Sequence, residues 1–330
     1  ASRAPGPPLL AYRAASCGLG SIAELAAVRA REPRFVETAF FIARVEIALL
    51  PSEGPGQARA HLAEAFARFP SSPAIAYAIG NYELIVEDPG EALAFFDRTL
   101  ALRADHDRAL LGRAIALGNL DRHEEAIEVA TRLIALDDAS RGEAYYWRAW
   151  NRHALGQLAE ARADITRSKE SSAAPNVFTL AGIIEFEQSD LDPARSDLEV
   201  AIAMGHDCTA RWYLGLVHRQ RKTWLAAGEA FQDAVACYRA RAQSSGAAMQ
   251  ALQTRTGLDP AYRARALAAL EASLTADNRQ LHLAALTGAS CAAAGGDVAS
   301  ARSLADLAGE DPALAERAAK LRDWLAKRHP

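Results

Sequence analysis

The chain has 330 residues, half of them hydrophobic, and nearly equal numbers of acidic and basic residues give a formal net charge of −4. Such a balance provides no positive field that would draw the chain to phosphate backbones, so nucleic acid is not an expected partner. Arg or Glu interrupts even the apolar run Phe40 to Leu50, so we expect no direct membrane span, which needs about 20 consecutive apolar residues.

Residues 1–33 are predicted to form an N-terminal extension with one short leading helix, Ile22 to Arg31. The run SRAPGPPL near the start carries proline and glycine, which disfavour a helix. The sequence begins at Ala1 without Met and without a charged-then-apolar leader, which fits removal of a signal segment and equally fits a trimmed chain. The expected location is periplasmic or extracytoplasmic, with a cytoplasmic one as the alternative.

A ladder of alanines recurs along the chain at intervals of 33 to 35 residues: Ala58, Ala92, Ala126, Ala161, Ala194 and Ala227. Mostly apolar or small residues follow each alanine at the fourth and seventh positions, which is one face of a helix. Twelve residues before the last five alanines stand further small residues, namely Gly80, Ala114, Ala149, Gly182 and Gly215. Each repeat is therefore predicted to be an antiparallel helix pair, in which two small residues allow close approach of the helices.

The spacing, the small pair and the turn resemble the tetratricopeptide repeat (TPR) family, bacterial type. The resemblance is carried by LLGRAIALGNLDRHEEAIEVA from Leu110, YYWRAWNRHALGQLAEARADI from Tyr145 and WYLGLVHRQRKTWLAAGEAFQDA from Trp212. It implies an all-α fold, a right-handed TPR superhelix, over residues 34–240. Five repeats are clear over residues 72–240, and a sixth, at 34–71, is degenerate because Glu46 takes the small position.

Residues 241–330 are predicted to form an irregular C-terminal helical module. We expect a helical continuation interrupted at Ser244 to Gly246, a helix that begins at Pro260 and ends near Leu274, and a degenerate repeat. The pair in that repeat is Asn278 to Ala294 and Val298 to Leu307, joined by two glycines, with Ala301 of the ladder's type. A last amphipathic helix, Pro312 to Lys327, is the expected cap of the array.

The resemblance implies that the first helices of successive pairs line a concave surface. The positions on that face are unusually aromatic and include polar partners, so we single out Tyr77, Asn81, Tyr146, Trp150, His153, Phe186, Trp212 and Arg219. Aromatic side chains with polar neighbours dominate binding hot spots. The competing interpretation is that individual aromatics pack against the neighbouring repeat. Only Asn81 and Arg219 have the residue types of the family's carboxylate clamp, and they are far apart in sequence, so we do not predict that clamp.

The leading hypothesis is a non-enzymatic scaffold whose concave aromatic face binds a segment of another protein, as a subunit or assembly factor of a bacterial complex. The first alternative is a small-molecule or lipid-binding component of a transport or sensing system, in which Tyr146, Trp150, Phe186 and Trp212 enclose a pocket. The second alternative is an enzyme, and its only support is that His153 and Arg219 lie on one face. The oligomeric state stays open.

Two of the four cysteines, Cys208 and Cys237, lie nearly level at the open end of one predicted hairpin because the Lys222 turn is almost midway between them. We expect either a disulfide or two buried thiols that act as small hydrophobes. Cys17 and Cys291 could pair only if the N-terminal extension reached the C-terminal module.

No cofactor or metal site is predicted. His206, Asp207 and Cys208 form a compact group of potential ligands, but Asp207 at the start of a helix is better explained as an N-cap. The sequence contains no HExxH, no GxSxG and no glycine-rich phosphate loop.

Overall fold

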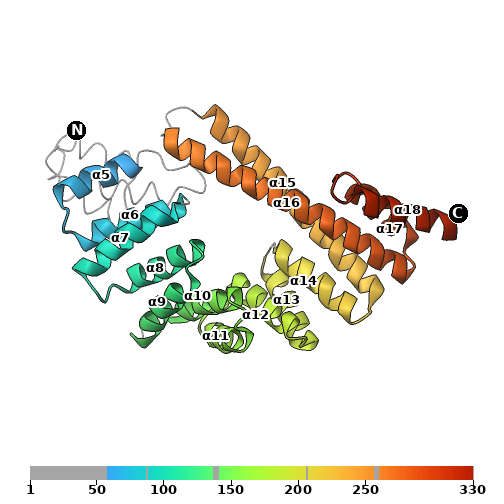
Figure 1. Ribbon diagram of the computed structural model, residues 1–330, viewed down its shortest axis with the longest axis horizontal. Helices are drawn as coiled ribbons and strands as arrows, with labels where there is room; N and C mark the ends of the chain where they lie inside the picture. Colours follow the sequence, from blue (N-terminus) through green and yellow to red (C-terminus); the bar gives the residue numbers. More distant parts are fainter. Residues whose placement is uncertain (1–57, 87, 137–140, 206, 256–259, 330) are drawn as a thin grey trace, which may run out of the picture. The chain divides into compact units, whose positions relative to one another are not determined.

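The computed structural model describes residues 58–329 apart from 87, 137–140, 206 and 256–259. This part of the chain consists of helices without a strand, as the sequence predicts (Figure 1). The helices up to residue 187 are α5 (Ala58–Arg68), α6 (Pro73–Ile85), α7 (Pro89–Leu102), α8 (Asp107–Asn119), α9 (His123–Ala135), α10 (Arg141–Ala154), α11 (Leu158–Ser171) and α12 (Pro175–Glu187). The others are α13 (Leu191–Met204), α14 (Cys208–Gln220), α15 (Trp224–Thr254), α16 (Pro260–Gly295), α17 (Val298–Ala308) and α18 (Ala315–Arg328).

The chain divides into two compact units, which are described separately. Unit 1 comprises residues 1–129 and 254–266, and unit 2 comprises residues 130–253 and 267–330. In unit 1, α6 packs against α5, α7 and α8. In unit 2, α10 packs on α11, α12 on α13 and α13 on α14, so both units are stacks of antiparallel helix pairs.

The alanine ladder forms the closest contacts of the stack. All six ladder alanines are fully buried. A Cβ atom placed on Gly80 would lie 2.8 Å from the Phe96 ring, and one on Gly182 would lie 2.6 Å from Leu198 Cγ. Both distances are shorter than van der Waals contact, so the paired helices approach closely because a side chain is absent at these positions.

A residue with positive φ closes each described turn between the helices of a pair, five positions before an alanine of the ladder type. These residues are Asp121, Gly156, Ser189, Lys222 and Gly296, with φ between 57° and 87°. A residue in the left-handed backbone conformation ends the first helix, and the chain then turns into the second helix. The recurrence at Gly296 shows that α16 and α17 are joined by the same turn as the repeats before them.

Two helices, α15 and α16, are longer than the sequence predicts. The expected interruption at residues 244–246 and the expected end near Leu274 are both wrong, because α15 runs for 31 residues and α16 for 36 without a break. Arg241 Nε lies 2.9 and 2.8 Å from the two carboxylate oxygens of Asp277, which is 1% exposed. Packing of one helix on the other thus outweighs the helix-breaking signals in the sequence.

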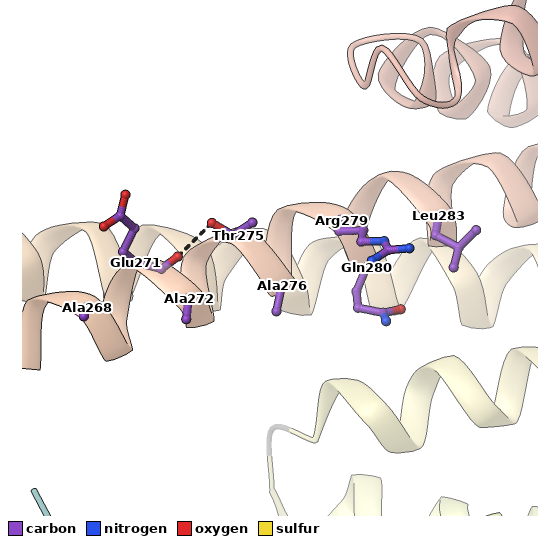
Figure 2. Close-up of a pocket in the computed structure, with 8 residues that line it drawn as sticks. All are labelled: Ala268, Glu271, Ala272, Thr275, Ala276, Arg279, Gln280 and Leu283. Atoms are coloured by element: carbon purple, nitrogen blue, oxygen red, sulfur yellow. Dashed lines mark hydrogen bonds between the residues drawn. The ribbon is translucent and has the colours of Figure 1, made fainter. Parts of the chain in front are cut away.

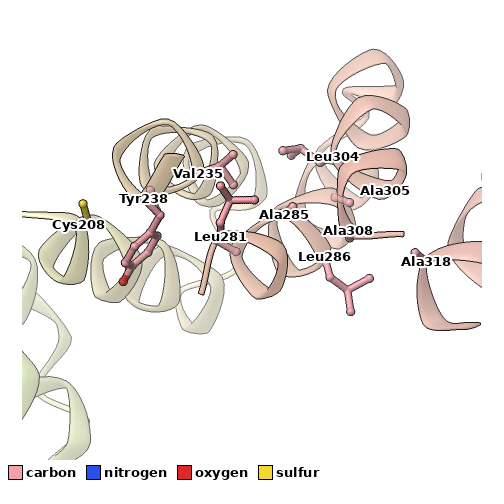
Figure 3. Packing of buried hydrophobic residues seen from close by; sticks show 13 residues of the cluster. Cys208, Val235, Tyr238, Leu281, Ala285, Leu286, Leu304, Ala305, Ala308 and Ala318 are labelled. Carbon is pink, nitrogen blue, oxygen red and sulfur yellow. The ribbon is translucent and has the colours of Figure 1, made fainter. Parts of the chain in front are cut away.

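The C-terminal end of α16 with α17 makes a further helix pair of the repeat type. Ala289 and Ala301 stand twelve residues apart, as the small residues of the earlier pairs do, and both are fully buried. Figure 3 shows Leu281 and Leu286 of α16 packed with Val235 of α15 and Leu304 of α17 in one hydrophobic cluster. Because Ala301 lies 74 residues after Ala227, the extended parts of α15 and α16 amount to an insertion of about 40 residues into the 34-residue period.

The last helix, α18, begins three residues later than the sequence predicts and packs against α17. Ala318 and Leu325 are fully buried, whereas Glu316, Lys320 and Asp323 are exposed. An apolar side and a polar side are what a terminal helix of a stacked array needs.

Several predictions lie outside the described residues. They are the extension at 1–33, the first helix of the degenerate repeat up to residue 57, Cys17 and His206. The domain limits 1–33, 34–240 and 241–330 stay predictions. The limit at residue 240 falls within α15, which continues through it.

Candidate protein-binding surface

In unit 2, the predicted site residues lie on α10, α12 and α14, which are the first helices of successive pairs. His153 of α10 and Glu187 of α12 occupy positions one repeat apart, and their Nε2 and Oε2 atoms lie 3.0 Å from each other. Both side chains are partly exposed. An ion pair of this kind contributes little energy but links the surfaces of the two helices.

Three aromatic rings of α10 form the first part of this surface. The centroid of Trp147 lies 5.3 Å from that of Tyr146 and 5.8 Å from that of Trp150, both in edge-to-face geometry. All three side chains are half-buried. Burial raises the pKa of Tyr146 despite a hydrogen bond with Asn176. The rings are therefore held in place while part of each stays accessible.

The aromatic surface continues from α12 to α14. Phe186 and Tyr213 meet edge to face with their centroids 5.7 Å apart. The pKa of the Tyr213 hydroxyl is raised by burial and by the nearby Glu187 carboxylate. We call the five rings on these three helices the aromatic ladder: Tyr146, Trp147, Trp150, Phe186 and Tyr213.

The surroundings of Trp212 and Arg219 differ from those of the five rings in the aromatic ladder. Trp212 lies 5.1 Å from Phe231, centroid to centroid, and packs against the buried cluster around Cys291, so it serves the core as well as the surface. Arg219 is exposed and close enough to Cys291 to lower the pKa of that thiol, although burial has the larger effect and raises it.

In unit 1, the predicted site residues are Tyr77 and Asn81 of α6. Tyr77 stacks on His106 with centroids 5.0 Å apart and lies 6.1 Å from Phe96. Both predicted residues are half-buried. Much of the Tyr77 ring is thus used to pack α6 against α7 and the start of α8.

Sequence reasoning missed Trp147, Glu187 and Tyr213. Each directly follows a selected residue, and their contacts show that the surface is wider than one row of side chains. For the two aromatics the signal was present, because the first helices carry three adjacent aromatics at Tyr145–Trp147 and two at Trp212–Tyr213.

The structure joins Cys208 and Cys237 in a disulfide whose Cα atoms are 5.4 Å apart, which connects α14 to α15. Cys291 is a buried free thiol. The disulfide lies at the end of the hairpin away from the Lys222 turn, beside the aromatic ring of Tyr238.

Asp207 is the N-cap of α14 and accepts a hydrogen bond from the Ala210 amide at 3.0 Å. Its other oxygen accepts from Thr179 Oγ1 at 2.5 Å. Within the described residues, no group of three or more His, Cys, Asp or Glu could hold a metal ion. Among the helices of that same part of the chain, none has the length and apolar character of a membrane span.

A groove of about 930 Å³ runs along one side of α16 in unit 2. Figure 2 shows that its eight lining residues all come from this helix, among them Glu271, Thr275 and Arg279. None of the four aromatics that the small-molecule hypothesis places around a pocket lines it. The groove therefore gives that hypothesis no support.

Comparison with known proteins identifies the fold. No protein-family model matches the sequence, and no curated protein sequence is significantly similar to it. Among solved structures, PilW, a type IV pilus biogenesis factor, superposes with a TM-score of 0.54 at 14% identity over 60% of this chain and 90% of its own. PilF of Pseudomonas aeruginosa has a TM-score of 0.53 at 16% identity over the same shares of the two chains.

A third similar structure, the Cut9–Hcn1 hetero-tetramer of the APC/C, has a TM-score of 0.53 at 17% identity. The superposition covers 84% of this chain and 54% of the matched chain in that structure. With the repeating helix pairs, the alanine ladder and the recurrent turn, these likenesses show that the chain is an α-solenoid with the TPR fold.

Proposed function

We propose that this protein is a non-enzymatic scaffold that binds a segment of a partner protein on the aromatic ladder of unit 2. The observation that supports this most directly is the run of five half-buried rings across α10, α12 and α14, bordered by the His153–Glu187 pair. Rigid, partly exposed aromatic side chains provide large contact area at small entropic cost. Trp212 and Arg219 of the same unit extend the proposed surface. Tyr77 and Asn81 are proposed as partner-binding residues of unit 1 by itself.

The partner is proposed to be another subunit of a bacterial complex, with this protein as a subunit or assembly factor. PilW is named as a biogenesis factor and Cut9 occurs in a hetero-tetramer, so proteins with this fold include members of larger assemblies. That fact supports the class of function, and it does not specify a partner.

A capture experiment from the native host tests the proposal. Tyr213→Ala with Trp150→Ala removes two rings of the aromatic ladder, and we expect at least tenfold weaker capture of every specific partner. Trp324→Ala is the matched control, because Trp324 on α18 is a ring of similar chemistry that is 38% exposed. If the double variant retained its partners at full affinity while folded, the aromatic ladder would not be the binding surface.

A further inference from the structure

A second candidate site lies in unit 1, in a cavity of about 230 Å³ between α5, α6 and α7. Its wall is apolar apart from three charged residues, and its lining is Arg59, Leu62, Ala63, Phe66, Ala67, Ile79, Tyr82, Glu83, Glu91 and Phe95. The residues that α6 contributes lie on the opposite side of that helix from Tyr77 and Asn81, because the helix has 3.6 residues per turn. The cavity is thus separate from the proposed scaffold surface.

Glu83 is the unusual residue in this cavity. Its side chain is 2% exposed, and Oε1 lies 3.2 Å from Arg59 Nε. Oε2 accepts no hydrogen bond from the described part of the chain, and Arg265 Nη2 lies 3.8 Å from it. Burial raises the pKa of Glu83 even though both arginines lower it. A buried carboxylate oxygen without a donor is destabilising, so the cavity is suited to a ligand that brings one.

The repeat in unit 2 that corresponds to this one shows what fills the same place. Arg59 and Arg162 each directly follow a ladder alanine, whereas Glu83 and Glu185 each lie three residues after a small glycine. Arg162 Nη2 lies 3.8 Å from Glu185 Oε1, so the arginine–glutamate pair is present in both units.

The two repeats differ at the positions next to that pair. Phe66 and Phe95 of unit 1 correspond to Lys169 and Asp197 of unit 2, which occupy the same positions relative to their ladder alanines. Lys169 Nζ lies 2.5 and 2.7 Å from the two carboxylate oxygens of Asp197 and lowers the pKa of Glu185. Glu185 Oε2, like Glu83 Oε2, accepts no hydrogen bond from the described residues. Unit 2 nevertheless places a lysine of its own near its buried glutamate, where unit 1 has two phenyl rings and a cavity.

The two rings suit a cation. Phe66 and Phe95 meet edge to face with centroids 5.5 Å apart. The Arg98 guanidinium already lies 4.6 Å from the Phe66 centroid and is held there by the Pro70 carbonyl at 3.0 Å, outside the residues that line the cavity. Aromatic faces attract guanidinium and ammonium groups, and the attraction increases as water is removed.

We propose that the cavity around Glu83, the Glu83 pocket, binds a lysine or arginine side chain of a partner protein. The aliphatic stem packs on Phe66, Phe95 and Leu62, and the charged end donates to Glu83 Oε2 and approaches Glu91. The lining itself carries two carboxylates and one arginine, and Arg265, outside the lining, lies 3.8 Å from Glu83 Oε2. Charge-assisted hydrogen bonds to a buried carboxylate are strong enough to select a basic side chain.

The test uses the full chain and two blocked pentapeptides, acetyl-AAKAA-amide and the same peptide with norleucine in place of lysine. Methyl NMR signals of Leu62, Ala63 and Ile79 report occupancy of the Glu83 pocket. We expect saturable shifts with the lysine peptide and at least tenfold weaker binding of the uncharged norleucine peptide. Equal binding of both peptides, or no shift with either, would overturn the proposal.

Variants assign the binding to Glu83. Glu83→Gln keeps the shape and removes the charge, so the lysine peptide should bind at least tenfold more weakly. Glu185→Gln is the matched control in unit 2 and should leave the affinity unchanged. If Glu83→Gln failed to fold, Glu91→Gln would serve instead, because Glu91 is exposed; unchanged affinity in whichever variant folds contradicts the proposal.

A double substitution provides an independent check. Phe66→Lys with Phe95→Asp transfers the lysine–aspartate pair of unit 2 into unit 1 and fills the Glu83 pocket from within. We expect this variant to lose the lysine peptide while retaining its helical circular dichroism. Retention of the peptide at wild-type affinity would show that binding occurs elsewhere. None of these measurements involves the aromatic ladder, so failure of one proposal leaves the other intact.

Discussion

The buried glutamates of the two units, Glu83 in unit 1 and Glu185 in unit 2, occupy equivalent repeat positions in different surroundings. Around Glu185 the chain supplies its own ions, since Lys169 binds Asp197 and Arg162 binds Asp190 with N–O distances of 2.5 and 2.6 Å. Around Glu83 the corresponding neighbours are phenyl rings, and a cavity remains. The same backbone frame thus carries a filled polar site in one repeat and an open one in another.

The comparison also shows how a solenoid can vary its surface without changing its stack. The ladder alanines and glycines, which set the distance between helices, are kept at both sites. The positions that differ lie on the second helices and contact each other between neighbouring pairs, Phe66 with Phe95 in unit 1 and Lys169 with Asp197 in unit 2. Binding specificity can therefore differ between repeats while each repeat still packs on the next.

The largest expected effect concerns the disulfide of unit 2, a covalent link that the described part of unit 1 does not have. The bond closes a loop with a sequence separation of 29 residues, for which chain entropy predicts a stabilisation of about 3.5 kcal/mol. Replacing both Cys208 and Cys237 by Ser should lower the free energy of unfolding by that order. Urea unfolding measures the change, and full alkylation of both cysteines without reductant would show that the bond does not form.

The next largest effect is the pH dependence of the free energy of unfolding of unit 2. Burial, and then the nearby Asp197 carboxylate, raise the pKa of Glu185 from 4.5 to about 7. The folded state therefore binds more protons than the unfolded state between these values, so the free energy of unfolding should fall by about 3 kcal/mol as pH rises through this window. Glu185→Gln should remove that fall and be more stable than the wild type at pH 8.

Unfolding curves at pH 4, 6 and 8 test this expectation. Because the pKa of Glu83 is also raised by burial, Glu83→Gln should change the pH dependence in the same direction. If the free energy of unfolding of Glu185→Gln varied with pH as that of the wild type does, the Glu185 carboxyl group would be solvated in solution.

A smaller effect is expected from the lysine that distinguishes the two sites. Lys169→Met leaves the Asp197 carboxylate, whose side chain is 11% exposed, without its cation, which should cost about 2 kcal/mol. Adding Asp197→Leu should recover most of this loss, since a buried ion pair can be replaced by packed apolar residues. A double-mutant cycle by urea unfolding measures the coupling, and additive losses would show that the two groups act independently.

The smallest effect concerns Arg265, which in unit 1 binds Asp88 at 2.8 Å, a role that Arg162 has toward Asp190 in unit 2. Both members of the Arg265–Asp88 pair are about one-third exposed, so Arg265→Ala should cost about 1 kcal/mol. It should also raise the pKa of Glu83 further, because Arg265 lowers it. Carbon-13 NMR titration of the glutamate carboxyl measures the shift, and an unchanged pKa would remove Arg265 from the site.

The repeat could be predicted from the amino-acid sequence alone. The spacing of the alanines and glycines predicted the helix pairs, and their complete burial confirms it. Small residues at a fixed period leave a local signal, because each one specifies the approach of two helices that are close in sequence. The N-cap role of Asp207 was likewise predictable, since capping involves residues only a few positions apart.

Only the tertiary structure decided where the helices end in the C-terminal region and which polar groups meet. Past Leu274, α16 packs on α15 through contacts such as the Arg241–Asp277 pair, whose members are 36 residues apart. Likewise, the Glu83 pocket combines side chains of three helices, and its cavity results from two rings whose unit 2 counterparts are charged. Such sites leave no periodic trace in the sequence, because they depend on contacts between repeats and on the two positions at which these similar repeats differ.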